Sequence, residues 1–347
     1  YHEQTDMDNI RKLREVLKTL PAFAKDYFRA IEPTTSTKTR ISYAYDIRIF
    51  FQFLISQNPS LAKIGIPNLN VSVLDQLKPI DIEEYMEYLK LYDSPNDQMT
   101  ITNGERGLKR KISSLRSFYT YYYKRQAIET NPVQLVDMPK IHDKAIIRLD
   151  AGETAALLDY IEHCGDQLTG QRKAYYEKTK LRDLAIVTLL LGTGIRVSEC
   201  VGLDVEDIDF RNNGIRLIRK GGSEMVVYFG PEVEKALKDY LEARKAISPL
   251  EGHEHALFYS TQRKRIGVQA VENLVKKYAR AITTTKKITP HKLRSTYGTT
   301  LYQETGDIYL VADVLGHKDV NTTKKHYAAM DDARRRKAAT AIRLRED

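Results

Sequence analysis

The sequence of 347 residues has no tryptophan and only two cysteines, Cys164 and Cys200. Two thiols cannot supply the disulfide framework of a small secreted domain, so we expect reduced side chains inside helices. No apolar run approaches the roughly 18 residues that a membrane-spanning helix needs. Residues 1–9 also lack a basic segment followed by an apolar one, the pattern of a secretion signal. The sequence therefore predicts a cytoplasmic protein with no membrane partner.

Motifs that bind cofactors are also missing. The chain has no glycine-rich phosphate loop ending in Lys-Ser or Lys-Thr and no cysteine and histidine set at zinc spacing. It also lacks the clustered aspartates of a nuclease that uses two metal ions. We therefore expect chemistry that uses no cofactor.

Positive charge is present in moderate excess. Lysine and arginine number 55 against 46 aspartates and glutamates, which gives a net charge of +9. This balance favours a polyanionic partner through long-range attraction and leaves both DNA and RNA as candidates. Hydrophobic residues make up 42% of the chain, enough for about two domains with buried cores.

The periodicity predicts a mainly α fold in two domains. Helical spacing runs through residues 1–138, with a short first helix within 8–31, and weak periodicity at 139–148 indicates a linker. Residues 149–347 are mostly helical in pattern, including a tail at 332–347. In their middle, short alternating segments separated by turn residues predict a small three-stranded antiparallel sheet.

Local signals indicate where elements of the first half begin. Ser36 or Thr37 is expected to cap one helix. Pro79 and Asp81 are expected to open another, with Glu84 as the partner in a capping box.

The second half carries similar signals. Asp150 or Thr154 is expected to cap its first helix, and a strongly apolar helix over 181–191 is expected to end at the turn 192–194. The expected strands are 205–210, 215–219 and 225–229.

A helix expected over about 103–126 has one apolar side and one cationic side. A cationic face suits a helix that follows a phosphate backbone, because each neutralised phosphate releases a condensed counterion. The alternative is a face that is simply solvated. The basic residues are Arg106, Lys109, Arg110, Arg116 and Lys124.

A second basic segment, Arg263, Lys264 and Arg265, precedes a helical pattern in the second half. It is placed to contact backbone phosphates or, alternatively, to form an exposed loop.

Polar residues of the second half suggest phosphoryl transfer. Residues three apart on a helix share a face, so a histidine and an arginine at 291 and 294 can approach one oxyanion together. Two arginines and two histidines can stabilise charge on a phosphate. A tyrosine, with an ordinary pKa of about 10, needs a base and a cationic field to attack. The residues are Arg196, Lys220, His291, Arg294, His317 and Tyr327.

Each of these residues alone fits an ordinary structural or solvated role, but their order resembles the signature of a family. The stretches 191–199 (LGTGIRVSE), 289–294 (TPHKLR) and 315–317 (LGH), followed by Tyr327, resemble the boxes of the tyrosine recombinases. That family includes Xer proteins, phage integrases and conjugative-transposon integrases, and the resemblance spans nearly the whole chain. It implies a helical core-binding, DNA-binding domain followed by a catalytic domain.

The resemblance also implies roles for the residues that bind the phosphate. Arg196, Arg294 and His317 would hold the scissile phosphate. Glu199 would take the acidic position that braces the arginines.

The remaining roles concern the tyrosine and the protons. Tyr327 would be the nucleophile, Lys220 would protonate the departing 5′ oxygen, and His291 would assist proton transfer. Three residues separate Thr323 from Tyr327, whereas the family often has two. Tyr302 and Tyr309 are rival nucleophiles, but both precede the LGH box and are out of family order.

The implied activity is site-specific recombination of double-stranded DNA through a 3′-phosphotyrosine bond and a Holliday junction, without metal or ATP. The implied assembly is a homo-oligomer, with a dimer on each site and a tetramer in the synapse. The tail at 332–347 would dock on a neighbouring protomer, pack on its own domain or stay loose. Two alternative functions are a catalytically silent DNA-binding protein of the same fold and a type IB topoisomerase or resolvase-like strand transferase.

Overall fold

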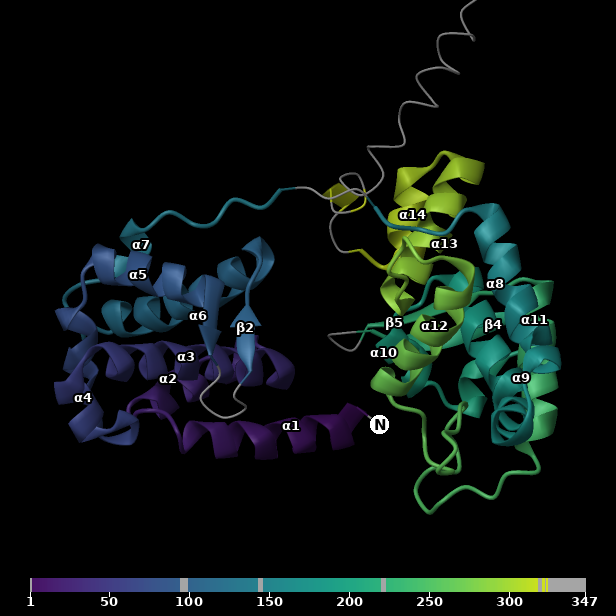
Figure 1. Cartoon of the computed structure of the whole chain (residues 1–347), viewed down its shortest axis with the longest axis horizontal. Helices are drawn as coiled ribbons and strands as arrows, with labels where there is room; N and C mark the ends of the chain where they lie inside the picture. Colours follow the sequence, from purple (N-terminus) through teal and green to yellow (C-terminus); the bar gives the residue numbers. More distant parts are fainter. Residues whose placement is uncertain are drawn as a thin grey trace, which may run out of the picture. The chain divides into compact units, whose positions relative to one another are not determined.

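The computed structural model describes residues 2–93, 99–142, 146–219, 223–317, 320–321 and 323. It divides into two compact units, residues 1–143 and 144–347. Within the described ranges helices predominate and the strands are short, so the predicted mainly α fold is confirmed (Figure 1). None of the described helices is long and apolar enough to cross a lipid bilayer.

The described part of the first unit consists of helices and one short hairpin. The helices are α1 (His2–Leu17), α2 (Ala24–Ala30), α3 (Thr37–Gln57), α4 (Pro59–Ile64), α5 (Pro79–Lys90), α6 (Glu105–Lys124) and α7 (Pro132–Leu135). The strands β1 (Leu91–Asp93) and β2 (Thr100–Thr102) pair antiparallel. The sequence did not predict this hairpin, because strands of three residues show too little alternation to be recognised.

The helix caps confirm one prediction and correct another. The Ser36 side chain accepts a hydrogen bond from the Thr39 N–H and caps α3, as predicted. In α5 the capping partner is Asp81, which accepts from the Lys78 N–H at 2.7 Å, and the prediction of Glu84 was wrong. The reason is that proline prefers the first helical position, which moves the capping positions one turn towards the N-terminus.

The core of the first unit is rich in aromatic side chains. Helices α2, α3, α5 and α6 contribute its fully buried rings. Phe51 of α3 and Phe118 of α6 meet edge to face, with ring centroids 6.1 Å apart. Such contacts combine a large buried apolar area with a defined geometry. They fix the apolar side of α6 against the core.

The described part of the second unit combines helices with one small sheet. The helices are α8 (Ala151–His163), α9 (Gly170–Thr193), α10 (Val197–Gly202), α11 (Pro231–Arg244), α12 (Val268–Ile282), α13 (Pro290–Thr305) and α14 (Ile308–Leu315). The strands are β3 (Ile208–Asp209), β4 (Gly214–Ile218) and β5 (Glu224–Tyr228).

The three strands form an antiparallel sheet in the order β3-β4-β5, which confirms the predicted sheet. Its first strand is shorter than predicted, because Val205–Asp207 forms a 3-10 helix. The predicted tail at 332–347 lies outside the described residues.

Within the second unit, helix α9 packs against α8, α11 and α13. It is longer than the predicted apolar stretch because a polar segment precedes that stretch in the same helix. Helix α8 begins at Asp150, whose side chain accepts from the Glu153 N–H at 2.8 Å, so the Asp150 alternative is confirmed. Cys164 and Cys200 are free and buried.

Candidate active site

The turn between α9 and α10 depends on a glycine. Gly194 ends α9 with φ 63° and ψ 18°, in the left-handed region, and its N–H donates to the Leu190 carbonyl oxygen. A Cβ at this position would lie 2.3 Å from a ring carbon of Tyr297. Backbone strain and packing therefore both exclude a side chain. The turn brings Arg196 to the N-cap of α10.

Glu199 holds Arg196 at two points. The Oε2 atom of Glu199 accepts from the Arg196 backbone N–H, and its Oε1 atom accepts from Arg196 Nη1, each at 2.7 Å. The Glu199 side chain is 7% exposed, whereas that of Arg196 is 40% exposed. A nearly buried carboxylate thus orients a guanidinium group that still presents surface to solvent.

Arg294 is buried in α13 and joins two helix ends. Its Nη1 donates to the carbonyl oxygen of Gly194, and its Nη2 donates to that of Leu315. Burial of a guanidinium group is costly unless it is hydrogen-bonded, and these bonds offset part of that cost. They also connect the end of α9 to the end of α14.

Three arginines from three segments donate to consecutive carbonyl oxygens at the C-terminus of α14. The pairs are Arg219 Nη2 with Val314 at 2.9 Å, Arg294 Nη2 with Leu315, and Arg196 Nη2 with Gly316 at 3.3 Å. Cations are favourable here, because the last carbonyls of a helix lack partners within the helix and carry the negative end of its dipole. The result is a cluster of three guanidinium groups at one helix end, and two of them, those of Arg196 and Arg219, also lie near the carboxylate of Glu199.

His317 directly follows this helix end. Its N–H donates to the Ala312 carbonyl oxygen at 2.9 Å, and its Nδ1 lies 2.7 Å from Thr323 Oγ1. Because Thr323 is buried, the ring is oriented by a group inside the fold. When the threonine hydroxyl donates to Nδ1, the neutral ring carries its proton on Nε2 and can donate it from there.

His291 lies in the first turn of α13 and is exposed. Helical spacing puts it on the side of α13 that carries Arg294, whose own side chain reaches the interior. Of the rival tyrosines, Tyr302 is half-buried on α13 and Tyr309 is exposed on α14.

Two predicted site residues, Lys220 and Tyr327, lie outside the described residues. Lys220 directly follows Arg219 in the chain, and Tyr327 follows Thr323 by four positions.

Arg219 belongs to the cluster, but the sequence analysis did not single it out. Its Nε lies 3.8 Å from Glu199 Oε1, and its side chain is 9% exposed. Burial lowers the pKa of Arg219 from its ordinary value, an effect that Glu199 opposes and Arg196 reinforces. The only signal in the sequence was its position next to Lys220.

The basic residues of α6 have different surroundings. Arg106, Lys109 and Lys124 are exposed. Arg110 forms an ion pair with Asp46, and Arg116 donates through Nη2 to main-chain carbonyl oxygens of the segment 133–136. Arg110 is exposed as well, since its side chain is 47% exposed despite the ion pair, whereas Arg116 is half-buried. All but Arg116 therefore have the exposure that a phosphate contact requires.

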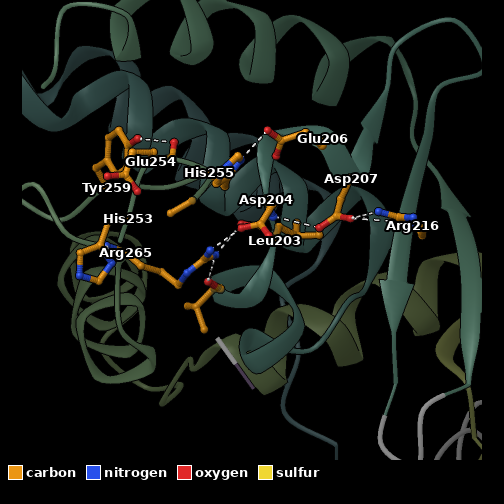
Figure 2. Close-up of polar contacts among 12 residues, drawn as sticks. Leu203, Asp204, Glu206, Asp207, Arg216, His253, Glu254, His255, Tyr259 and Arg265 are labelled. Carbon is orange, nitrogen blue, oxygen red and sulfur yellow. Dashed lines mark hydrogen bonds and ion pairs between the residues drawn. The ribbon is translucent and has the colours of Figure 1, made fainter. Parts of the chain in front are cut away.

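The basic segment before α12 is divided in the same way. Arg263 and Lys264 are exposed. Arg265 donates to the Leu203 carbonyl oxygen at 2.7 Å and forms an ion pair with Asp204; Figure 2 shows its guanidinium group directed at Asp204. The guanidinium of Arg265 therefore makes contacts within the second unit. The phosphate contact of this segment stays a prediction.

The candidate site is composed mainly of guanidinium groups. They suit phosphate oxygens because each can donate two parallel hydrogen bonds. Within the described ranges, no group of three or more His, Cys, Asp or Glu side chains is arranged to hold a metal ion. The arrangement can fix a phosphate and stabilise charge that develops on it.

Comparison with known proteins relates this site to a family. Residues 148–334 match the phage integrase family. The tyrosine recombinase XerC of Caldanaerobacter subterraneus subsp. tengcongensis is 32% identical over 346 residues, which cover 96% of this chain and 90% of that protein.

Two solved structures share the fold. The Tn1549 transposon integrase in complex with transposon right end DNA has a TM-score of 0.63 at 21% identity, with 91% of this chain and 98% of that chain covered. The XerH site-specific recombinase bound to palindromic difH substrate in a post-cleavage complex has a TM-score of 0.62 at 18% identity, with 88% and 79% covered. The family match and the relationship to XerC together show that this chain belongs to the phage integrase family of tyrosine recombinases.

Proposed function

We propose that this protein is a site-specific DNA recombinase that cleaves and rejoins DNA strands through a covalent bond between Tyr327 and a 3′ phosphate. The observation that carries the proposal is the convergence of three arginines on the end of α14, next to His317. Of these groups, the guanidinium groups of Arg196 and Arg294 would stabilise negative charge on a phosphate in the transition state without reorganising, and Arg219 holds the same helix end. Family membership supports the same class of reaction.

In this site the scissile phosphate is held by groups that the fold positions in advance. Arg196 and Arg294 bind its non-bridging oxygens, and His317 donates a further hydrogen bond from Nε2. Glu199 acts through Arg196, because its carboxylate accepts from both the backbone and the side chain of that arginine.

The chemical step is an attack of Tyr327 Oη on phosphorus. The Oη–P bond forms while the bond from phosphorus to the 5′ oxygen breaks. His291 takes the proton of the tyrosine hydroxyl, and Lys220 gives a proton to the departing 5′ oxygen. The phosphotyrosine keeps the energy of the broken bond, so a 5′ hydroxyl from a partner duplex can reverse the step without ATP or a metal ion.

Recombination requires this step on each strand of two duplexes. Exchange of one strand pair and then the other passes through a Holliday junction. Each exchanged strand needs its own Tyr327, so the active assembly is a dimer on each site and a tetramer in the synapse.

The first domain, residues 1–138, supplies DNA contacts in this proposal, and residues 139–148 link it to the catalytic domain. Its exposed cations on α6 would contact backbone phosphates. In the catalytic domain Arg263 and Lys264 are also exposed and would contact backbone phosphates in the same way. The XerH recombinase and the Tn1549 integrase, which share this fold, are both DNA-bound in their solved structures.

A covalent-capture experiment tests the proposal without knowledge of the target sequence. The protein is incubated in EDTA with a pool of randomised duplexes that carry nicks, so that the short strand released by cleavage diffuses away. DNA that stays attached after denaturation is sequenced. Enrichment of one sequence, attached through its 3′ phosphate, supports the recombinase.

Other outcomes support the alternatives. Attachment without sequence preference, together with relaxation of supercoiled DNA, would favour a topoisomerase. Specific retention that is lost on denaturation would favour a catalytically silent DNA-binding protein.

A further inference from the structure

Arg219 occupies an unusual environment for an arginine beside a turn. Its side chain is 9% exposed, although an arginine beside a turn normally extends its charge into water. Its backbone N–H donates to the Ser223 carbonyl oxygen at 2.9 Å, across the turn between β4 and β5. The guanidinium group points into the protein, where Nη2 donates to the Val314 carbonyl oxygen at 2.9 Å.

The surroundings are shaped to accept this side chain. Gly316 ends α14 with φ 60°, and a Cβ there would lie 1.1 Å from Arg219 Nη1. The absence of a side chain at Gly316 thus makes room for the guanidinium group. On another side Glu199 Oε1 lies 3.8 Å from Arg219 Nε, a distance for ionic attraction and too long for a hydrogen bond. Among the described residues no group accepts a hydrogen bond from Nε.

These contacts fix one end of the turn to the phosphate-binding cluster. Val314 and Gly316 belong to the helix end that also accepts from Arg196 and Arg294. Lys220 directly follows Arg219 in the chain, and consecutive Cα atoms are about 3.8 Å apart, so an anchor at Arg219 fixes the point from which the turn continues.

We propose that Arg219 is a positioning residue, which anchors the turn so that Lys220 can deliver its proton to the departing 5′ oxygen. This inference rests on the proposed function, in which Lys220 is the general acid. Misplacement of a catalytic group by about 1 Å can reduce a rate by about 100-fold. Loss of Arg219 should therefore slow the protonation of the leaving group, while the attack by Tyr327 is affected less.

A pair of DNA substrates separates these two effects. One is an ordinary nicked duplex that carries the captured target sequence. In the other, sulfur replaces the bridging 5′ oxygen at the scissile phosphate. When the P–S bond breaks, the sulfur leaves as a thiolate that needs no proton, because thiols are far more acidic than alcohols. A general-acid defect should therefore slow only the oxygen substrate.

Single-turnover cleavage of both substrates is measured for the full chain and three variants. Arg219→Met is expected to cleave the oxygen substrate roughly 100-fold more slowly and the sulfur substrate at close to the wild-type rate. Lys220→Ala is expected to show the same pattern. Arg244→Met is the matched control, because Arg244 also donates to main-chain carbonyl oxygens of the second unit, outside the site. Arg244→Met is expected to cleave both substrates at the wild-type rate.

The outcomes distinguish this inference from the proposed function. Suppose that Lys220→Ala cleaves the sulfur substrate at close to the wild-type rate. If Arg219→Met then cleaves both substrates equally slowly, or both at the wild-type rate, the inference alone is overturned. If Lys220→Ala itself slows both equally, the general-acid role fails and the inference fails with it. If Arg219→Met does not fold, Arg219→Lys is used in its place, because lysine keeps the positive charge but lacks the planar guanidinium group. This variant is also expected to cleave only the oxygen substrate more slowly.

Discussion

The carboxylate of Glu199 accepts two hydrogen bonds of 2.7 Å from Arg196, one from the backbone N–H and one from Nη1. The first bond caps the start of α10, and the second orients a guanidinium group at the same point. Because the two bonds share one side chain, the position of α10 and the direction of the arginine are coupled. Local helix capping therefore contributes directly to the geometry of the site.

Substitution Glu199→Gln tests this coupling. The amide keeps the shape of the side chain but loses the charge that strengthens both hydrogen bonds. A charge-assisted hydrogen bond contributes about 1.5–3 kcal/mol, so single-turnover cleavage of a nicked duplex should slow by about 10- to 100-fold. Glu206→Gln changes an exposed carboxylate of the same unit and should cleave like the wild type. Equal rates for both variants would contradict the bracing role of Glu199.

Substitution Gly316→Ala tests the space that the helix end leaves for Arg219. Alanine would meet both left-handed backbone strain and a collision with the Arg219 guanidinium. Gly252→Ala is the control, since Gly252 has φ 80° and nothing within 4 Å of an added Cβ. Urea unfolding should show a loss of about 1–2 kcal/mol for Gly252→Ala and about 1–3 kcal/mol more for Gly316→Ala. Equal losses would mean that the Arg219 side chain does not need this space.

Two neighbouring cations on α6 should behave differently. Arg110 pairs with Asp46, whose side chain is 1% exposed and which also has Lys111 within 3.4 Å. Arg110→Met should therefore lower the free energy of unfolding by about 2–3 kcal/mol. This loss is smaller than for a buried carboxylate with a single cationic partner, because Lys111 still neutralises Asp46. Lys109→Met should change it by less than about 0.5 kcal/mol.

DNA binding provides the complementary measurement for this pair. Lys109→Met should weaken binding to the captured duplex and reduce the salt slope of the binding constant by about 1, the value for one phosphate contact. An unchanged slope would remove Lys109 from the DNA interface. Unchanged stability of Arg110→Met would mean that its ion pair with Asp46 contributes little.

The stabilisation contributed by the exposed ion pair of His255 and Glu206 depends on pH. Their Nδ1 and Oε1 atoms lie 2.8 Å apart, and Figure 2 shows the contact. This hydrogen bond raises the pKa of His255 above its ordinary 6.5 and lowers that of Glu206 below its ordinary 4.5. The stabilisation is lost as pH rises through the raised histidine pKa or falls through the lowered glutamate pKa, so it is complete between pH 4.5 and 6.5.

An NMR titration of the histidine ring checks this prediction. Glu206→Gln should bring the pKa of His255 back towards 6.5, because it removes the carboxylate that favours the imidazolium. A pKa that stays equally high in the variant would assign the shift to another group.

Local rules account for what the sequence could predict. Ser36 and Asp150 cap helices through hydrogen bonds three residues along the chain, and the turn at Gly194 needs a left-handed glycine. Such signals lie within a few residues, so they can be recognised without a fold. The error at Glu84 was also local, since it came from misplacing the start of a helix by one turn.

Contacts between residues far apart in the chain could not be predicted from the sequence. Arg110 is 64 residues from Asp46, and nothing near either residue indicates the pair. Arg219 reaches Val314 across 95 residues, and only packing shows that its guanidinium turns inward. The order of motifs identified residues of the candidate site, but not how the end of α14 collects three arginines.

The role of Tyr327 as nucleophile is tested most directly by covalent capture of the recovered target sequence, in EDTA, with the wild-type protein and with Tyr327→Phe, resolved on a denaturing gel. The wild type is expected to form a protein–DNA adduct and Tyr327→Phe is expected to form none, while both proteins bind the duplex equally. An adduct that survives in Tyr327→Phe would assign the nucleophile to another residue, with Tyr302 and Tyr309 the first to test. Tight binding of this duplex without any adduct would contradict the recombinase function itself.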